Sequence, residues 1–264
     1  MQQRATTTGA GTADAVGGPS ALIRRRWVWV VVVYAAVVLS FASYEALNAA
    51  PPQDRWPAYY AADPATGELV QPLTGAEPFQ TFVLKSWADE RIPFVPWLAV
   101  PYLSYLLLVP FVIPALNLAA GTFRRFLTVG CALVVAQVVL DAGFVLFQTY
   151  VIRDESAGGG AGGALVRLVW GNDLPFNGFP STHIAWTTIG IVALWRIRTR
   201  FPKTSWILMA WLCLVYPATL MLRQHYLIDV YAGIPIGFAA YWACMFVVER
   251  PRLVPRDEAP LTLP

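Results

Sequence analysis

Long apolar runs, separated by short charged or proline-rich segments, are the feature that most constrains this sequence. Most of them are between about 17 and 25 residues long, which an α-helix needs to cross a hydrocarbon core about 30 Å thick. Helices are the structure expected there, because each backbone polar group must find a partner within its own segment. The runs cover residues 27–47, 97–120, 126–150, 179–197, 206–222 and 228–248. We therefore predict an all-α integral membrane protein, a bundle of six transmembrane helices.

The composition agrees with a membrane protein and argues against several other classes. The chain is 57% hydrophobic and only 13% charged, whereas soluble domains average about 25% charged residues. A net charge of +3 is too small to indicate a nucleic-acid partner. Cys131, Cys213 and Cys244 all lie in apolar runs without paired spacing, so we expect neither a disulfide nor a zinc site.

Three regions are expected along the chain. Residues 1–23 are rich in Thr, Ala and Gly and lack aromatic residues, which is typical of a disordered tail. Residues 24–250 form the six-span catalytic domain. Residues 251–264 form a C-terminal tail on the cytoplasmic side.

The distribution of basic residues predicts the orientation in the membrane. Short loops rich in Lys and Arg stay on the cytoplasmic side. With the N-terminus inside, most of the 19 Lys and Arg residues fall in cytoplasmic segments. We therefore expect a plasma (cytoplasmic) membrane protein with both termini in the cytoplasm. The polar segments 180–183 and 223–229 then share the extracytoplasmic face, although they are far apart in the sequence.

These two segments contain the only two histidines of the chain. Histidine titrates nearest to neutral pH and is the commonest side chain for proton transfer. In residues 180–183, Pro-Ser-Thr-His, Ser181 or Thr182 can cap a helix whose N-terminus attracts a phosphate. His183 would then lie close to a bound oxyanion.

The second segment runs from Arg223 through His225 to Asp229. His225 and Asp229 are four residues apart, so one helical turn brings the carboxylate next to the imidazole. A carboxylate in that place fixes the tautomer of a histidine and raises its basicity. Arg223 adds a planar set of donors suited to phosphate oxygens.

Residues 179–183 and 225–230, together with Ile-Pro-Phe-Val-Pro-Trp at 92–97, resemble the motifs of the type 2 phosphatidic acid phosphatase superfamily. The resemblance is closer to its inositolphosphotransferase branch, which includes inositol phosphorylceramide synthase-like enzymes. It covers about residues 80–248.

The resemblance implies a six-helix bundle that works through a phosphohistidine. It implies that His225 is the nucleophile, that Asp229 orients it and that His183 is the general acid. Ser181 and Arg223, with Thr182 beside them, are the implied phosphate ligands. A lipid phosphate would be the substrate, an alcohol could be the acceptor, and no cofactor or metal is expected.

The sequence departs from the superfamily pattern at three points. The first motif of the superfamily has Lys, six residues and then Arg-Pro, whereas Lys85 and Arg91 enclose five residues and Ile92 precedes the proline. Two interpretations of Lys85 and Arg91 therefore stay open: they bind phosphate, as the first-motif residues of the superfamily do, or they are solvated charges in a loop. The third-motif arginine position holds Thr219, so Arg223 would substitute for it, and Thr182 stands where phosphatases commonly have Gly. These departures favour the transferase branch.

Other interpretations stay open at this point. The substrate could be a phosphatidic acid, a polyprenyl phosphate or diphosphate, or a phosphoinositide donor with a lipid alcohol acceptor, and water or an alcohol could receive the phosphoryl group. A serine hydrolase would leave one histidine without a role. A six-span transporter or channel would use the same residues as a proton or anion path. Asp141, midway along the 126–150 run, is expected to face the interior as structural polar packing.

Overall fold

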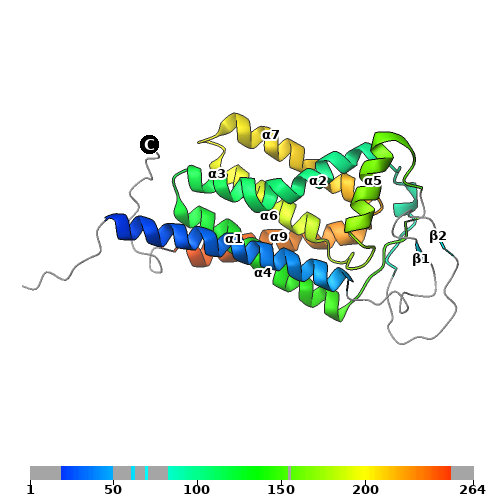
Figure 1. Ribbon diagram of the computed structural model, residues 1–264, viewed down its shortest axis with the longest axis horizontal. Coiled ribbons are helices and arrows are strands. Elements are labelled where there is room, and N and C mark those ends of the chain that lie inside the picture. Colours follow the sequence, from blue (N-terminus) through cyan, green and yellow to red (C-terminus); the bar gives the residue numbers. More distant parts are fainter. Residues whose placement is uncertain (1–18, 50–60, 63–68, 71–82, 154–155, 251–264) are drawn as a thin grey trace, which may run out of the picture.

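The computed structural model describes residues 19–49, 61–62, 69–70, 83–153 and 156–250 (Figure 1). Residues 1–18 of the disordered tail expected over 1–23, and the tail at 251–264, lie outside the described residues, whereas residues 19–23 are helical and belong to α1. The helices longer than one turn are α1 (Pro19–Ala49), α2 (Ala99–Leu107), α3 (Ile113–Ala119), α4 (Phe123–Leu146), α5 (Gly160–Asn172), α6 (Thr182–Ile197), α7 (Pro202–Cys213), α8 (Val215–Met221) and α9 (Leu227–Val248). The short elements are 3-10 turns at Asp89–Arg91 and Pro96–Leu98, a π-helical turn at Leu108–Val112, and the antiparallel strands β1 (Ala61–Ala62) and β2 (Leu69–Val70). Apart from this small strand pair the described regular structure is helical, as predicted.

Five helices of the described residues are long and apolar enough to cross a membrane, judged by length and composition. They cover Arg26–Asn48, Pro96–Ala119, Phe123–Leu146, Pro202–Met221 and Leu227–Val248. The second of these is continuous through α2, the π-helical turn and α3. The π-helical turn contains Pro110, which has no N–H for a regular helical hydrogen bond.

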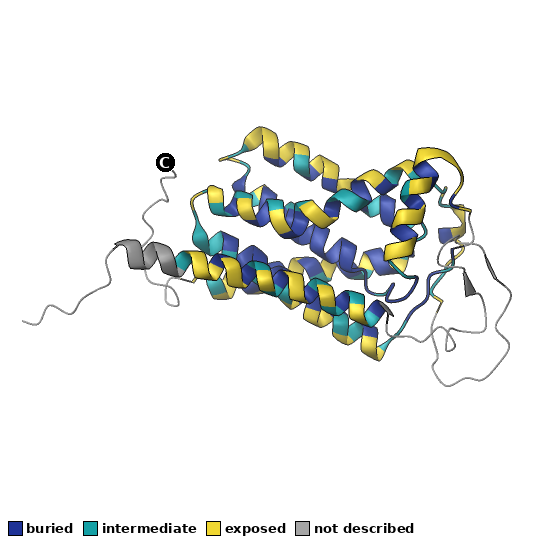
Figure 2. Ribbon diagram, viewed as in Figure 1, coloured by how far each residue is buried: buried dark blue, intermediate teal, exposed yellow. Residues whose placement is uncertain are grey.

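Helix α6 is the short sixth run, and it occupies the centre of the bundle. It has 16 residues and packs against α9, α7 and α4. Nearly all of its side chains are buried, including Trp186, Ile189 and Leu194, so Figure 2 shows it dark blue among helices with exposed outer faces. The other helices therefore enclose α6 and separate most of it from the outer surface of the bundle.

Small residues let α9 approach α6 closely. A Cβ on Gly233 would lie 2.8 Å from the Ser181 carbonyl oxygen, and one on Gly237 would lie 2.3 Å from that of Ala185. Inside a membrane the hydrophobic effect does not drive helices together, so they associate through close packing of this kind. It fixes the start of α9 against the start of α6, where both histidine segments lie.

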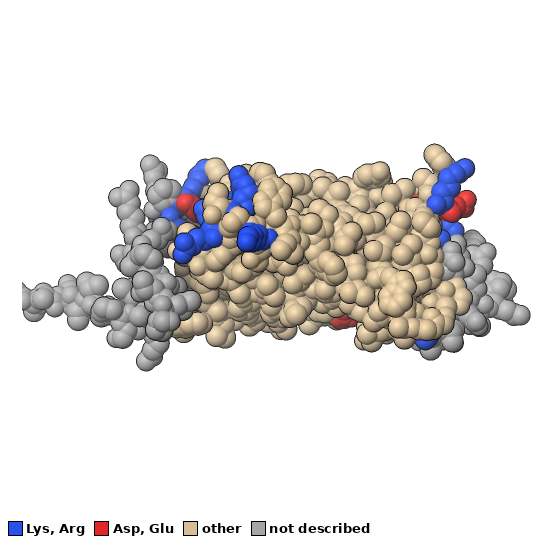
Figure 3. All heavy atoms as spheres, turned by 90° about the horizontal axis from the view of Figure 1, so that it is seen from above, with Lys and Arg blue, Asp and Glu red and all other residues tan. Residues whose placement is uncertain are grey.

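The charged side chains gather at the two ends of the bundle. In Figure 3 a wide belt almost free of Lys, Arg, Asp and Glu separates the two ends, and Lys and Arg are concentrated at the end where α1 begins. That end contains the α3–α4 and α6–α7 connections, with Arg125 and Arg198, and the end of α9. Asp141 on α4 is half-buried and accepts hydrogen bonds from Ser43 and Gln137, as the structural interpretation predicts.

The glycine-rich segment between α4 and α6 corrects one expectation. The glycines of residues 151–179 are typical of a flexible loop, whereas residues 160–172 form α5, which lies across the end of the bundle (Figure 1). Gly162 packs on Pro96, and a Cβ on Gly163 would lie 2.2 Å from the Gly158 carbonyl oxygen. These glycines therefore serve close packing, and the Trp170 indole N–H anchors the helix by donating to the Leu222 carbonyl.

Candidate active site

His225 lies in the connection between α8 and α9. The Thr219 carbonyl oxygen accepts hydrogen bonds from the backbone N–H groups of both Gln224 and His225. Arg223 has a φ of 55°, the left-handed conformation that ends α8 and turns the chain toward α9. Thr219 therefore holds the histidine backbone, at the position where the superfamily motif usually has arginine.

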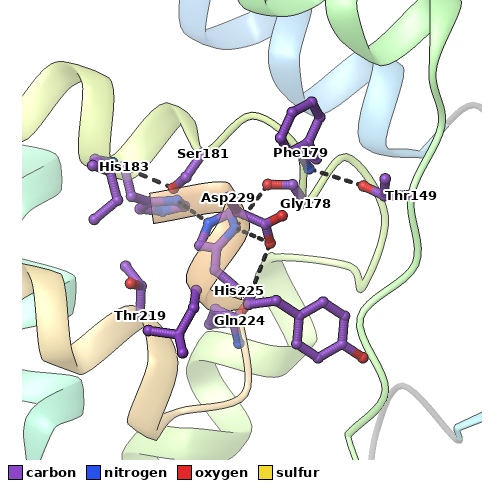
Figure 4. A network of polar contacts seen from close by, with 12 residues as sticks. Thr149, Gly178, Phe179, Ser181, His183, Thr219, Gln224, His225 and Asp229 are labelled. Carbon is purple, nitrogen blue, oxygen red and sulfur yellow. Dashed lines mark hydrogen bonds and ion pairs between the residues drawn. The ribbon is translucent and has the colours of Figure 1, made fainter. Parts of the chain in front are cut away.

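The Nδ1 atom of His225 contacts two acceptors. It lies 2.9 Å from the Gly178 carbonyl oxygen and 3.5 Å from Oδ2 of Asp229 (Figure 4). A carbonyl oxygen only accepts hydrogen bonds, so Nδ1 carries a proton in this contact. In the neutral ring, Nε2 then presents a lone pair.

Asp229 is buried in the first turn of α9. Its Oδ2 accepts a hydrogen bond from the Tyr226 backbone N–H at 2.8 Å, and its backbone carbonyl accepts from the Ser181 N–H. Asp229 therefore caps α9, joins it to α6 and faces His225, as the four-residue spacing predicts. Gly178 had no sequence signal beyond its place before the Pro-Ser-Thr-His segment.

The rings of His225 and His183 meet edge to face. Nε2 of His225 lies 3.3 Å from Nδ1 of His183, and the ring centroids are 5.4 Å apart. Both side chains are buried. Because Nε2 of His225 is the acceptor, Nδ1 of His183 is the nitrogen that carries the proton between them.

Asp173, which the sequence did not single out, lies on the other side of His183. Its Oδ2 is 3.8 Å from Nε2 of His183. Oδ1 accepts from the Tyr44 hydroxyl at 2.6 Å and from Asn48 at 3.0 Å, and Oδ2 accepts from the Tyr102 hydroxyl at 2.6 Å. The carboxylate follows directly after α5, so the helix that we did not expect delivers it.

Burial raises the pKa of the Asp173 carboxyl. The charge of protonated His183 and the hydrogen bonds from Tyr102 and Tyr44 lower it more, and the net pKa is below its ordinary value. Arg153 acts in the same direction and donates to the Asp173 backbone carbonyl. The carboxylate is therefore ionised at neutral pH.

The Pro-Ser-Thr-His segment begins α6 as predicted. The Oγ of Ser181 accepts the Ile184 backbone N–H at 3.3 Å, which is an N-cap. This bond uses an acceptor lone pair of the hydroxyl, so its O–H can still donate to the phosphate that the resemblance assigns to it. The Thr182 Oγ1 atom, in contrast, is buried with no hydrogen-bond partner among the described residues.

A small pocket opens beside His225. Its lining residues are Lys85, Asp89, Ile92, Ile152, Leu220, Arg223, His225 and Tyr226. Asp89 organises this wall, because its Oδ1 accepts the Leu227 backbone N–H at 2.8 Å at the start of α9. Its backbone carbonyl accepts from Arg223 at 3.5 Å. The pocket thus brings Lys85 and Arg223 to the same wall as the histidine.

Comparison with known families supplies the deciding observation. Residues 98–252 match the PAP2 superfamily. The chain belongs to the PAP2 superfamily. Members of the PAP2 superfamily are generally phosphatases or phosphotransferases, so the resemblance read from the motifs is confirmed at this level. Comparisons with curated proteins and with solved structures give no match.

The PAP2 match includes both histidines, Asp173 and Asp229, but begins after Lys85 and Arg91. Arg91 is turned away from the pocket: it donates to the Trp87 carbonyl at 2.8 Å and its guanidinium lies 4.6 Å from the Trp87 ring centroid. Of the two first-motif candidates, only Lys85 lines the pocket. No group of three or more His, Cys, Asp or Glu side chains in the described part of this PAP2 chain could hold a metal ion.

Proposed function

We propose that this protein transfers or hydrolyses a phosphate ester of a lipid at the extracytoplasmic membrane face, through a phosphohistidine on His225. The inositolphosphotransferase-like activity is the form that the motifs favour. Phosphatidic acid phosphatase and polyprenyl phosphate or diphosphate phosphatase are the alternatives. The PAP2 match supports phosphoric-ester chemistry in general.

The observation that carries the proposal is the order of donors and acceptors through the two rings. The Gly178 carbonyl fixes the proton of His225 on Nδ1, so Nε2 is a nucleophile with a free electron pair. The facing Nδ1 of His183 carries a proton. One nitrogen is thus prepared to attack phosphorus and the other to protonate a leaving oxygen, without further assumptions about tautomers.

In the first step, Nε2 of His225 attacks phosphorus and a P–N bond forms. The P–O bond to the lipid alcohol breaks, and the departing oxygen takes its electron pair and the Nδ1 proton of His183. In the second step, His183 removes a proton from water or an alcohol, whose oxygen attacks phosphorus. The P–N electrons return to His225, and inorganic phosphate or a new phosphodiester leaves.

Substrate binding must separate the two rings. A phosphorus atom placed for attack lies about 3–3.5 Å from the nucleophile, and this is the whole present spacing of 3.3 Å between the two nitrogens. The phosphoryl group therefore replaces the contact between His225 and His183. Lys85 and Arg223 on the pocket wall, and the Thr182 hydroxyl, are the groups that we assign to its oxygens.

The proposed topology has six spans, with α6 as the short central one. It places the end bearing α5 outside the cell and the Arg-rich end in the cytoplasm. Single cysteines at Ser156 and Lys203, both exposed, test it after the three native cysteines are replaced. An impermeant thiol reagent should label only position 156 in right-side-out vesicles, and labelling of both from one side would contradict the topology.

The activity is tested with purified protein and labelled phosphatidic acid, polyprenyl phosphate or phosphatidylinositol, each with and without a lipid alcohol. Release of inorganic phosphate indicates a phosphatase, and a new phosphodiester indicates a transferase. Brief reaction should also leave an acid-labile label on the protein that His225→Gln cannot acquire. A labelled His225→Gln protein, or no turnover of any of these substrates, would reject the proposal.

A further inference from the structure

Asp173 occupies a position behind His183 that mirrors the one behind His225. Nδ1 of His183 faces His225 at 3.3 Å, whereas its Nε2 faces the Asp173 carboxylate at 3.8 Å. His183 is buried, with 4% of its surface exposed, and the Asp173 side chain is 13% exposed. An ionised carboxylate at this distance favours a proton on Nε2.

We propose that Asp173 is the positioning residue of the general acid, which favours the doubly protonated form of His183 and aims its Nδ1 proton at the leaving oxygen. This inference rests on the proposed function, because it assigns a partner to the acid of that reaction. It adds a second carboxylate to a site in which the sequence predicted only Asp229.

Tyrosine side chains surround the Asp173–His183 pair. The hydroxyls of Tyr44 on α1 and Tyr102 on α2 both donate to the Asp173 carboxylate at 2.6 Å. The Tyr102 ring also stacks on His183 at 4.6 Å between centroids, with Tyr105 at 4.9 Å. Aromatic faces attract cations, so the same tyrosines that hold the carboxylate also favour an imidazolium.

Two further ionisable groups, Glu45 and Arg153, lie near the Asp173–His183 pair. Glu45 on α1 interacts electrostatically with Asp173. Arg153, which follows α4, is fully buried and donates to the Asp173 backbone and to the Gln224 side chain. Since Arg153 binds the carbonyl and not the carboxylate, the carboxylate oxygens point to the tyrosines, Asn48 and His183.

The balance of protons requires this partner in both steps. His183 gives its Nδ1 proton to the lipid oxygen in the first step and regains a proton from water or alcohol in the second. A buried imidazole without an anion would release its second proton easily, because burial disfavours the charged form. Asp173 opposes this effect of burial and thereby favours the return of His183 to the acid form after each turnover.

The first test does not depend on activity. The chain has two histidines, so ¹⁵N-histidine labelling gives two imidazole spin systems, and His225→Gln assigns the remaining one. In Asp173→Asn the His183 titration should move to lower pH by about one to three units. An unchanged His183 titration in a folded Asp173→Asn protein would overturn the inference.

The second test is the pH profile of kcat/KM. A general acid must be protonated to act, so its pKa sets the alkaline limb. Asp173→Asn should move this limb to lower pH by the same shift, with at least a tenfold loss at pH 8. Tyr102→Phe removes one donor but leaves the carboxylate in place, so its alkaline limb should move much less than that of Asp173→Asn.

Asp141→Asn is the matched control. It makes the same carboxylate-to-amide change in the bundle, where Ser43 and Gln137 contact the carboxylate, and its alkaline limb should stay in place. An equal shift in both variants would mean a general effect of buried charge and would reject the role of Asp173. If the wild-type protein forms no phosphohistidine, the proposed function fails, whereas the histidine titration still tests the Asp173–His183 pair.

Discussion

The Nδ1 atom of His225 lies 2.9 Å from the Gly178 carbonyl oxygen, nearer than the Asp229 carboxylate at 3.5 Å. A backbone carbonyl thus shares with a carboxylate the task of fixing the tautomer of the proposed nucleophile. The Phe179 backbone N–H next to it donates to the Thr149 hydroxyl at 2.9 Å, so the peptide that bears this carbonyl is held from both sides.

Asp229→Asn should therefore reduce kcat by less than a carboxylate loss in the serine protease triad, where it costs about 10⁴-fold. The Gly178 carbonyl keeps the proton of His225 on Nδ1 even when Asp229 is neutral. The measurement is kcat for lipid phosphate cleavage in Asp229→Asn and His225→Gln. Equal, complete losses would show that the carbonyl does not hold the tautomer.

Gly178→Ala should strongly reduce kcat. Its Cβ would lie 2.9 Å from Val151 Cγ2 and 3.3 Å from Oδ2 of Asp229, so the carbonyl must shift from His225. The control is Gly171→Ala, because a Cβ at this position meets nothing within 4 Å. This substitution should stabilise α5 by up to about 1 kcal/mol. A fully active Gly178→Ala enzyme would contradict this account of the nucleophile.

The leaving group should separate the roles of the two histidines. A nitrophenyl phosphate leaves without protonation, whereas a lipid alcohol needs the proton of His183. We expect His183→Gln to lose most activity on the lipid ester but to retain much of it on the nitrophenyl ester. His225→Gln should lose both. A reversed pattern, with His225→Gln active on the nitrophenyl ester, would exchange the two roles.

Lys85→Gln and Arg223→Gln should each raise KM for a lipid phosphate by about tenfold or more, since a charge-assisted hydrogen bond contributes about 1.5–3 kcal/mol. Both residues line the pocket beside His225. Arg91→Gln, with its guanidinium on Trp87, should leave KM unchanged. Steady-state kinetics with one substrate compares the three, and a KM effect confined to Arg91 would restore the first-motif assignment.

Glu249→Gln should destabilise the Arg-rich end of the bundle without changing kcat/KM. Glu249 pairs with Arg196 at 2.6 Å and 2.7 Å. Burial raises its pKa, but the Arg196 hydrogen bonds lower it more, so the pKa is below its ordinary value of 4.5.

A depressed carboxyl pKa stabilises the protein above the ordinary value, and the contribution is lost as pH falls through the folded-state value. The variant should therefore unfold more easily at pH 7, by about 1–2 kcal/mol. The difference from wild type should shrink below pH 4.5, as thermal unfolding in detergent can show. A difference that grows with acid would contradict the sign of this shift.

The pattern of long apolar runs in the sequence predicted most of the fold, for a direct physical reason. Apolar runs of membrane length must be helices, since a bilayer core offers no other partner for their backbone groups. The Ser181 cap and the spacing of His225 and Asp229 also follow from local rules, because each involves residues within one helical turn. Only the central helix, at 16 residues, lacks the length that such rules require.

The contacts that the sequence could not predict all join segments far apart in the chain. Asp173 reaches His183 because α5 packs across the end of the bundle. The glycine content of α5 is typical of a loop, so the sequence did not predict this helix. The Tyr44 and Tyr102 hydroxyls come to it from α1 and α2. Arg91 fails to join the pocket because a local turn directs it onto Trp87.

The sequence by itself determined the membrane helices, the helix caps and the two histidine segments, since periodicity and spacing act within a few residues. The tertiary structure alone decided which nitrogen of each imidazole faces its partner, and which carboxylate stands behind His183. These depend on how closely glycine-lined helices approach one another, and close packing between distant segments has no signature in the order of residues along either one.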